Sequence, residues 1–385
     1  MDDKLLMRCC GDLVVFRPDM DSAFTKTKDE LQEADITFGV LEANCSDNVG
    51  IHNVSSCCNM PCSSYPSFPS YLKKYGFDVV SWASNHALDY GRLPFLETID
   101  RCKEAGLEIV GAGKDEEDAY KYIVMERKGT KIAILSYCSI LPQGYWAFDK
   151  RPGVNPARAY NGYSMIVHDQ PGTPARMYSF ADPADLARMK QDIANARKEA
   201  DIVMVSMHWG IHFKFAEIAD YQREYAYAAI DAGADIVLGH HAHVIKPIEV
   251  YKGKVIFYSF GNFYQEEFDL MTRDMETTGH KSTKDNKLHK EVNNSISAET
   301  FAKATRTFPP DSYLGIMAQI YMEDKKIQAV SYKPVVLPDD RCTYIAKHDD
   351  PMFDKIAQFV KDVDAHEGIH TEYEVSGDEI FIKTE

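Results

Sequence analysis

The sequence has little cysteine and no long apolar run, and each shortage excludes a class of protein. No stretch approaches the 18 apolar residues that a membrane-spanning helix needs. Only six mostly apolar residues precede Gly11, too few for the apolar region of a signal peptide, so we expect a cytoplasmic protein. Nine cysteines in 385 residues, among them the pairs Cys9-Cys10 and Cys57-Cys58, are too sparse for a disulfide framework and are expected to be reduced thiols.

Basic charge is also scarce. Lysine and arginine number 43 against 59 aspartate and glutamate residues, which gives a formal net charge of −16. A protein that binds a phosphate backbone needs basic surface, so we expect no nucleic-acid partner. The lack of a long apolar run likewise predicts no membrane partner. With 26% charged and 45% hydrophobic residues the chain is typical of a globular protein. A small-molecule or peptide-like substrate is the expected partner, and an oligomer is left open.

Short apolar runs alternate with helical patterns from residue 5 to about residue 262. This alternation is typical of parallel strands joined by crossover helices, and it predicts an α/β fold. The expected strands are 5–10, 36–41, 78–83, 107–110, 122–125, 131–137, 201–207 and 235–238, followed by a hairpin of 248–251 and 255–258. The expected helices are 91–105, one capped by Asp182 and begun by Pro183, and 220–232.

The chain after residue 264 changes character. Residues 265–311 are polar, and we interpret them as a helical insertion that acts as a lid, with Phe268, Leu270 and Met271 available to pack over a ligand. Residues 312–385 then predict strands at 314–322, 327–337 and 379–382 and a helix at 351–364. The predicted organisation is a core of residues 1–264, the insertion, and C-terminal strands and a helix that complete the same domain.

Seven polar residues follow the predicted strands, where open α/β sheets place their sites. They are Asp12, Glu42, Asn85, His86, His208, His241 and His243. Carboxylate oxygens together with imidazole nitrogens suit one or two divalent ions of intermediate hardness, such as Mn, Zn or Fe. His241 and His243 are expected on the same side of an extended segment. His240 is an alternative ligand to His241, although a packed position is favoured for it.

Several sequence blocks resemble the CapA family, which is named for poly-gamma-glutamate capsule biosynthesis. They are Gly11-Asp12 with Arg17, Leu41-Glu42, Ser84-Asn85-His86-Ala87-Leu88-Asp89-Tyr90-Gly91, His208-Trp209-Gly210, Gly239-His240-His241-Ala242-His243-Val244 and Tyr258-Ser259-Phe260-Gly261-Asn262-Phe263. The match covers roughly residues 5–264. The resemblance implies the calcineurin-like metallophosphatase fold, a two-sheet α/β sandwich with flanking helices and a metal centre at the strand ends.

The resemblance also implies roles for individual residues. Asp12 and His243 correspond to ligands of a first metal, Asn85, His208 and His241 to ligands of a second, and Glu42 to the carboxylate that bridges them. His86 corresponds to the acid that meets the leaving group, Asp89 and Arg17 are grouped with it as catalytic, and metal-bound hydroxide is the nucleophile. The chain departs from the pattern at Val14, where the wider superfamily has histidine, at Val40 and at Ala242.

These features predict a metal-dependent hydrolase acting on an ester, amide or peptide-like, lactone or phosphoester substrate. Two alternatives stay open: a metal-assisted epimerase that moves a proton next to a carbonyl, and a non-catalytic accessory protein of poly-gamma-glutamate assembly. Cys45, Cys57, Cys58 and Cys62 match no zinc pattern and are interpreted as ordinary thiols. The segment 137–151, with Tyr145, Trp146 and Phe148, is a candidate wall of the pocket, with local packing of the aromatic side chains as the alternative.

Overall fold

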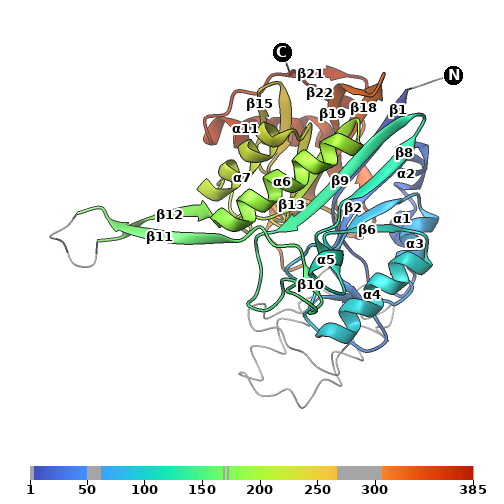
Figure 1. Ribbon diagram of the computed structural model, residues 1–385. Helices are drawn as coiled ribbons and strands as arrows, with labels where there is room; N and C mark the ends of the chain where they lie inside the picture. The colour runs from blue at the N-terminus through green and yellow to red at the C-terminus, as the bar shows by residue number, and fades with distance from the viewer. Residues whose placement is uncertain (1–3, 50–61, 168–169, 171–172, 267–305, 385) are drawn as a thin grey trace.

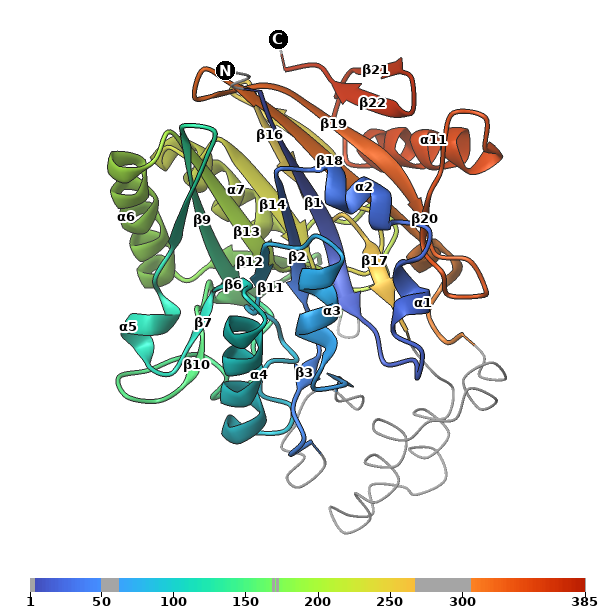
Figure 2. The same cartoon turned by 90° about the vertical axis from the view of Figure 1, so that its right-hand side faces the viewer.

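Two β-sheets packed face to face, with helices on both outer faces, form the body of the protein (Figures 1 and 2). The computed structural model describes residues 4–49, 62–167, 170, 173–266 and 306–384. Apolar side chains from both sheets, among them Met7 and Phe38 from the first and Ile134 and Met204 from the second, form one buried cluster between them. The predicted α/β class and the two-sheet sandwich are confirmed.

The first sheet joins strands from both ends of the chain. Its strands lie in the order β21-β22-β19-β18-β1-β2-β5-β6, with β17 beside β1 and β20 beside β19. In that order their bounds are Tyr373–Ser376, Glu379–Ile382, Lys326–Val336, Leu314–Glu323, Leu5–Val14, Ile36–Leu41, Val79–Ser81 and Glu108–Val110, with Asn262–Gln265 for β17 and Tyr344–Ile345 for β20. Because β18 pairs antiparallel with β1, the C-terminal strands extend the sheet that the first strand begins.

The second sheet comes from the middle of the chain. Its order is β15-β16-β14-β13-β9-β8, with bounds Ile248–Tyr251, Lys254–Phe257, Ile236–His240, Ile202–His208, Thr130–Cys138 and Ile123–Arg127. The central strands β9, β13, β14 and β16 are parallel. Since parallel strands present their carboxyl ends at one edge, the residues that follow β13 and β14 lie together there.

Helices cover the outer faces of both sheets. α3 (Phe68–Lys74) and α4 (Arg92–Glu104) pack on the first sheet, and α6 (Pro183–Glu199) and α7 (Asp220–Ala232) pack on the second. The predicted start of α6 is confirmed, because the Asp182 side chain accepts hydrogen bonds from the amides of Ala184 and Asp185. α11 (Pro351–His366) packs beside β19 and β15. The short helices are α1 (Asp21–Phe24), α2 (Lys28–Glu33), α5 (Glu116–Ala119) and the 3-10 turn η1 (Pro310–Tyr313).

A hairpin of β11 (Ala159–Met165) and β12 (Ala175–Ala181) projects away from the body, as Figure 1 shows on the left. No strands were predicted for these residues. Two further short pairs are β3 (Asn44–Cys45) with β4 (Ser63–Ser64) and β7 (Ala112–Gly113) with β10 (Gly153–Val154).

Several predicted boundaries need correction or lie outside the described part. β1 continues to Val14, four residues beyond the predicted end at Cys10, and Gln265 belongs to β17 and not to the insertion. Most of the predicted lid, with Phe268, Leu270 and Met271, lies outside the described residues, as do Cys57 and Cys58. The division into core, lid and C-terminal part stays a prediction. None of the helices in the described ranges has the length and apolarity to cross a bilayer.

Candidate metal centre

Both sheets supply side chains to one cluster at their carboxyl edge. Asp12 lies within β1, and Glu42 and Asn85 follow β2 and β5 of the first sheet. His208 is the last residue of β13, and His241 comes directly after β14 of the second sheet. All of them are buried. The core between the two sheets therefore ends in a polar cluster. Its members are spread over more than 200 residues of the sequence, and the fold brings them together.

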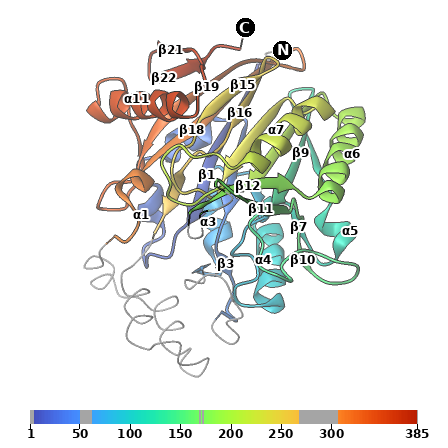
Figure 3. The ribbon, with the colours of Figure 1, turned by 90° about the vertical axis from the view of Figure 1, so that its left-hand side faces the viewer.

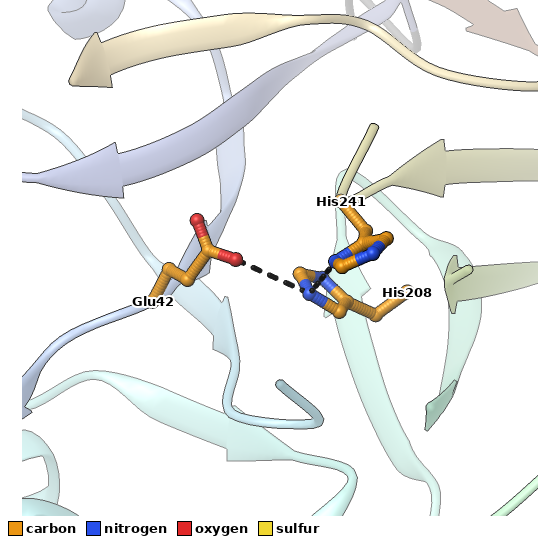
Figure 4. Close-up of side chains that lie close together, drawn as sticks. All are labelled: Glu42, His208 and His241. Carbon is orange, nitrogen blue, oxygen red and sulfur yellow. Dashed lines mark hydrogen bonds and ion pairs between the residues drawn. The ribbon is translucent and has the colours of Figure 1, made fainter. Parts of the chain in front are cut away.

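One half of the cluster is built on His208. Its Nε2 lies 2.7 Å from Oδ1 of Asn85, 3.2 Å from Nδ1 of His241 and 3.3 Å from Oε1 of Glu42. Oδ1 of Asn85 is also 3.1 Å from Nδ1 of His241. Figure 4 shows the two imidazoles and the Glu42 carboxylate pointing toward one another. One ligand atom each from Glu42, His208 and His241 lies within 4.8 Å of the others, a spacing that one metal ion can bridge.

The other half shares Glu42. One ligand atom each from Asp12, Glu42 and His243 again lies within 4.8 Å of the others. Nδ1 of His243 is 3.6 Å from Oδ2 of Asp12, and its Nε2 is 3.6 Å from Oε2 of Glu42. The Glu42 carboxylate thus faces His208 with one oxygen and His243 with the other. This is the arrangement expected of a carboxylate that bridges two ions.

The backbone after β14 is held in an uncommon conformation. His241 has a φ of 86° and His243 a φ of 54°, both in the left-handed region that non-glycine residues rarely adopt. The expectation that these two histidines lie on an extended segment is therefore wrong. The His241 amide donates to Oδ2 of Asp12 at 3.2 Å, which fixes the turn against the first sheet. Such strain is retained where the surrounding structure holds it, and it concentrates at functional sites.

The donor set fits divalent cations. Burial and the neighbouring Glu42 carboxylate raise the pKa of Asp12 well above its ordinary value. Within the described residues no lysine or arginine pairs with either carboxylate, and Oδ1 of Asp12 and Oε1 of Glu42 accept no hydrogen bond. Two buried carboxylates without a counter-charge are costly, and bound cations remove that cost.

The three histidines are in the protonation state that metals bind. Burial lowers the pKa of His208 to about 3 and the pKa of His243 to about 4, and it lowers the pKa of His241 well below the ordinary value. A neutral imidazole has a free nitrogen lone pair for coordination. Nδ1 of His243 lies 2.7 Å from Oδ1 of Asn262 on β17, which holds the ring in place. A second partner of this kind orients a ligating histidine.

His86 and Asp89 form a pair beside the cluster. Nδ1 of His86 is 2.6 Å from Oδ2 of Asp89, and the same carboxylate accepts hydrogen bonds from the Cys62 amide at 2.8 Å and the Tyr145 hydroxyl at 3.4 Å. Burial alone lowers the pKa of His86, but the charge and hydrogen bond of Asp89 and the charge of Glu42 together outweigh it and raise the pKa to about 9. The side chain of His86 is 13% exposed and that of Asp89 is fully buried, so His86 is the member that a substrate can reach.

Arg17 is placed differently from the other predicted residues. Its guanidinium forms a buried ion pair with Glu266 and also donates to Oγ of Ser22 and to the carbonyl of Arg341. These contacts tie the segment after β1 to residues far along the chain. The structure gives Arg17 a structural position and does not bring it into the cluster, so the geometry does not support the predicted catalytic role.

One site histidine was missed from the sequence. The His212 ring lies 3.8 Å from that of His241 and 5.3 Å from that of His243, measured between centroids. Burial lowers its pKa to about 4. Its position depends on Gly210, with a φ of 93°, and on the Phe213 amide, which donates to the Ala242 carbonyl at 3.0 Å. The block His208-Trp209-Gly210 ends two residues before His212. The short distance in sequence from this block is the signal that could have indicated His212.

His240, the alternative ligand, lies in the core. Its ring centroid is 6.0 Å from that of Phe38 and 5.2 Å from that of Phe260. The neighbouring Gly239 lets β14 lie close to the end of β16, because a methyl group there would overlap the Tyr258 carbonyl oxygen. The geometry therefore favours His241 over His240 as the ligand.

Comparison with protein families gives a match over most of the chain. The model of a family described as "Bacterial capsule synthesis protein PGA_cap" matches residues 7–267. The "PGA biosynthesis protein CapA" of Bacillus subtilis is 39% identical over 204 residues, which is 53% of this chain and 46% of that protein. The "Capsule biosynthesis protein CapA" of Bacillus anthracis is 29% identical over 284 residues, 71% of this chain and 62% of that protein. The matches thus span about half to three fifths of these curated relatives.

A further relative and two solved structures give more distant matches. A "Probable polyglutamine synthesis accessory protein" of Mycobacterium tuberculosis is 32% identical over 188 residues, 48% of this chain and 44% of that protein. A hypothetical protein from Thermus thermophilus has a TM-score of 0.47 and 15% identity, covering 87% of this chain and 100% of that one. The calcineurin-like phosphoesterase YfkN of Bacillus subtilis has a TM-score of 0.41 and 12% identity, with coverage of 94% and 98%.

Proposed function

Since this chain belongs to the PGA_cap family of bacterial capsule synthesis proteins, as its motif blocks predicted, we propose that it is a metal-dependent hydrolase. The observation that carries the proposal is the pair of ligand sets that share Glu42. Asp12, Glu42 and His243 would hold one divalent ion, and Glu42, Asn85, His208 and His241 would hold a second. A mixture of imidazole and carboxylate ligands favours Mn, Zn or Fe.

Bound ions in such a centre supply a water of lowered pKa and polarise the bond to be cleaved. The chain's own residues do the rest. The Asp12 and Glu42 carboxylates provide the negative charge that keeps cations in a buried site, and Asn262 holds the His243 ring at 2.7 Å. The left-handed turn at His241 and His243 presents their imidazoles to the first sheet without loosening β14.

His86 is the proton donor of the proposed mechanism. Asp89 accepts from Nδ1, which leaves Nε2 of His86 as the nitrogen that can serve a substrate. The charge and hydrogen bond of Asp89, together with the Glu42 charge, keep the imidazole protonated, and this is the form that delivers a proton to a departing oxygen or nitrogen. The Cys62 amide and Tyr145 hydroxyl also donate hydrogen bonds to Asp89, so the pair is fixed before substrate arrives.

The substrate class is proposed from the family. The names of the relatives connect them with PGA biosynthesis and polyglutamine synthesis, and a polymer of glutamate is held together by amide bonds. We therefore place a peptide-like amide first, with ester, lactone and phosphoester substrates as the other classes that the same donor set can serve. A proton donor beside the metal ligands suits an amide, because the amine leaving group must be protonated.

Metal analysis together with turnover tests this proposal. Protein purified without chelator should contain divalent metal, cleave a glutamate oligomer or a member of an ester, amide and phosphoester panel, and lose both metal and turnover after chelation. His241→Ala should lose metal, and His370→Ala, at an exposed histidine, should behave as wild type. A protein that binds no metal, or whose turnover survives its removal, contradicts the proposal.

A second candidate function is an accessory role in glutamate-polymer synthesis, favoured by the name of the Mycobacterium tuberculosis relative. It predicts that His86→Ala, which leaves the ligand sets intact, still supports polymer production in cells that lack the chain. A hydrolytic role predicts that this variant fails. Uptake of solvent deuterium without cleavage would instead identify proton transfer next to a carbonyl as the reaction.

A further inference from the structure

The hairpin of β11 and β12, here called the arm, is held to the described part of the body by hydrogen bonds at its base. The Tyr160 hydroxyl donates to Oδ2 of Asp182 at 2.7 Å. The amides of Ser179 and Ala181 donate to Asp220 at 3.1 Å and to Glu224 at 2.8 Å, both on α7. These contacts aim the arm away from the body, and in Figure 3 it points toward the viewer.

Beyond its base the arm has an apolar face that no described residue covers. In the antiparallel register Tyr163 lies opposite Met177, and Met165 projects from the same face. Their exposed fractions are 70%, 59% and 56%. A two-stranded hairpin has no core of its own and is marginal in water, so a regular seven-residue pair with such a face is typical of a surface that another chain covers.

The outer edge of β11 is open for strand pairing. The amides of Ser179 and Ala181 point away from β11, since they donate to α7. In an antiparallel ladder, directly opposite residues point their amides either both toward each other or both away. The residues opposite them, Asn161 and Ala159, therefore point their amides away from β12. Tyr163 follows the same alternation. No other strand in the described part of the chain pairs with this edge, since the arm is a sheet of two strands.

The described residues of the same chain do not explain why Gly162 stands at the middle of β11. Its φ is outside the left-handed region, and among the described residues a methyl group on it would meet only Cε1 of Phe180, at an ordinary 3.5 Å. Glycine weakens a strand and often marks a place where another backbone approaches closely. This observation indicates that a second backbone lies beside β11 at Gly162.

We propose that the second backbone is β11 of another copy of this chain, paired antiparallel about a two-fold axis at Gly162. Asn161 of each copy then exchanges hydrogen bonds with Tyr163 of the other. The two Gly162 residues form a non-hydrogen-bonded pair, the type in which the Cα atoms approach to about 4.5 Å. The two Tyr163 rings lie diagonally across the axis, within the reach of aromatic side chains.

Charge favours a second copy as the occupant. The chain carries a formal charge of −16, yet the strands of the arm contain a single charged side chain, Arg176. Two copies that meet through their arms keep their acidic bodies apart and avoid like-charge repulsion. A symmetric pairing also closes on itself, since each edge satisfies the other and leaves no open-ended filament.

Solution mass and edge variants test the proposal. The full chain should have twice its mass of 43.6 kDa by light scattering. Asn161→Pro removes an outward amide and blocks the edge, while proline is tolerated on the free side of an edge strand. We expect it to weaken dimerisation by about tenfold or more, and Asn161→Thr, which keeps the amide, should still dimerise. Circular dichroism and the melting temperature should match wild type for both.

A cysteine at the axis provides a second, independent readout. Gly162→Cys should form an intermolecular disulfide on mild oxidation, because the expected Cα separation lies within the usual disulfide range. Ser164→Cys is exposed on the same face but would lie about 14 Å from its symmetry mate, so it should not cross-link. Peptide mapping separates this bond from those of the native cysteines.

Two outcomes would overturn the proposal. One is a full chain that stays monomeric over a wide concentration range. A monomer whose arm instead binds phosphatidylglycerol vesicles, measured by co-sedimentation, belongs to this outcome. The other is a dimer that survives Asn161→Pro and gives no Gly162→Cys cross-link, since its interface would then lie elsewhere on the molecule.

Discussion

Replacing Gly11 by alanine tests how the first ligand is positioned. Gly11 precedes Asp12 on β1 and faces Gly261, which precedes Asn262 on β17. A methyl group on Gly11 would overlap the Gly261 carbonyl oxygen and come within 3.0 Å of the carbonyl carbon. Both atoms belong to the backbone and cannot rotate away, so β1 and β17 must separate.

The cost of this separation can be estimated. Overpacking a closely packed site typically costs 1–3 kcal/mol, and a backbone clash places Gly11→Ala at the upper end, about 3 kcal/mol. A chain of this length has an unfolding entropy of about 0.8 kcal/mol per degree, so the melting temperature should fall by about 4 °C. The shift also moves Asp12 and Asn262, which supports His243, so affinity for the metal should fall as well.

The assay is thermal unfolding with and without added Mn or Zn, together with metal content. His370→Ala, at an exposed histidine outside β1 and β17, is the control. We expect the control to melt within a degree of wild type. If Gly11→Ala does the same and retains its metal, the close approach of β1 and β17 does not position the centre, and the reasoning fails.

Further predictions concern the centre, a buried ion pair and pH. His241→Ala should lose most bound metal by elemental analysis, whereas His86→Ala should keep it and lose turnover; equal metal loss would make His86 a ligand. Arg17→Met should lower the free energy of unfolding by about 3–5 kcal/mol in denaturant titrations, because it leaves Glu266 buried and unpaired, while metal content stays unchanged. Burial raises the pKa of Asp364 to about 7, so its contribution to stability is complete below about pH 4 and is lost as pH rises through 7. Asp364→Asn should flatten that part of the pH profile of unfolding, and an unchanged slope would contradict the assignment.

The sequence predicted best where one local rule decides the structure. α7 occupies the expected residues 220–232, and α6 begins after its Asp182 cap. The convergence of the ligands could also be predicted, because parallel strands present their ends at one edge. The arm was missed because β12 and most of β11 lack the alternation of a half-buried strand: apolar side chains project from both faces.

The rest depended on contacts that no local pattern contains. Arg17 lies near Asp12 in sequence, and its ion pair with Glu266, 249 residues away, places it outside the cluster. The turn after β14 bends at His241 and His243 because the Asp12 carboxylate holds the His241 amide from the opposite sheet. A strand-end rule indicates that such residues come together, but it does not specify the backbone conformation that directs them.

The division of ligands between the two sheets has a mechanical consequence. The interior between the sheets is apolar, and such packing resists separation but has no directional bonds that oppose sliding. Coordinate bonds have fixed lengths and angles, and in this centre they would run from Asp12 and Glu42 on one sheet to His208 and His243 on the other. Occupancy would therefore lock the alignment of one sheet over the other at the carboxyl edge. Without metal the fold would be the same, but the carboxyl edge would fluctuate more. Its amide hydrogens would then exchange faster than those at the opposite edge.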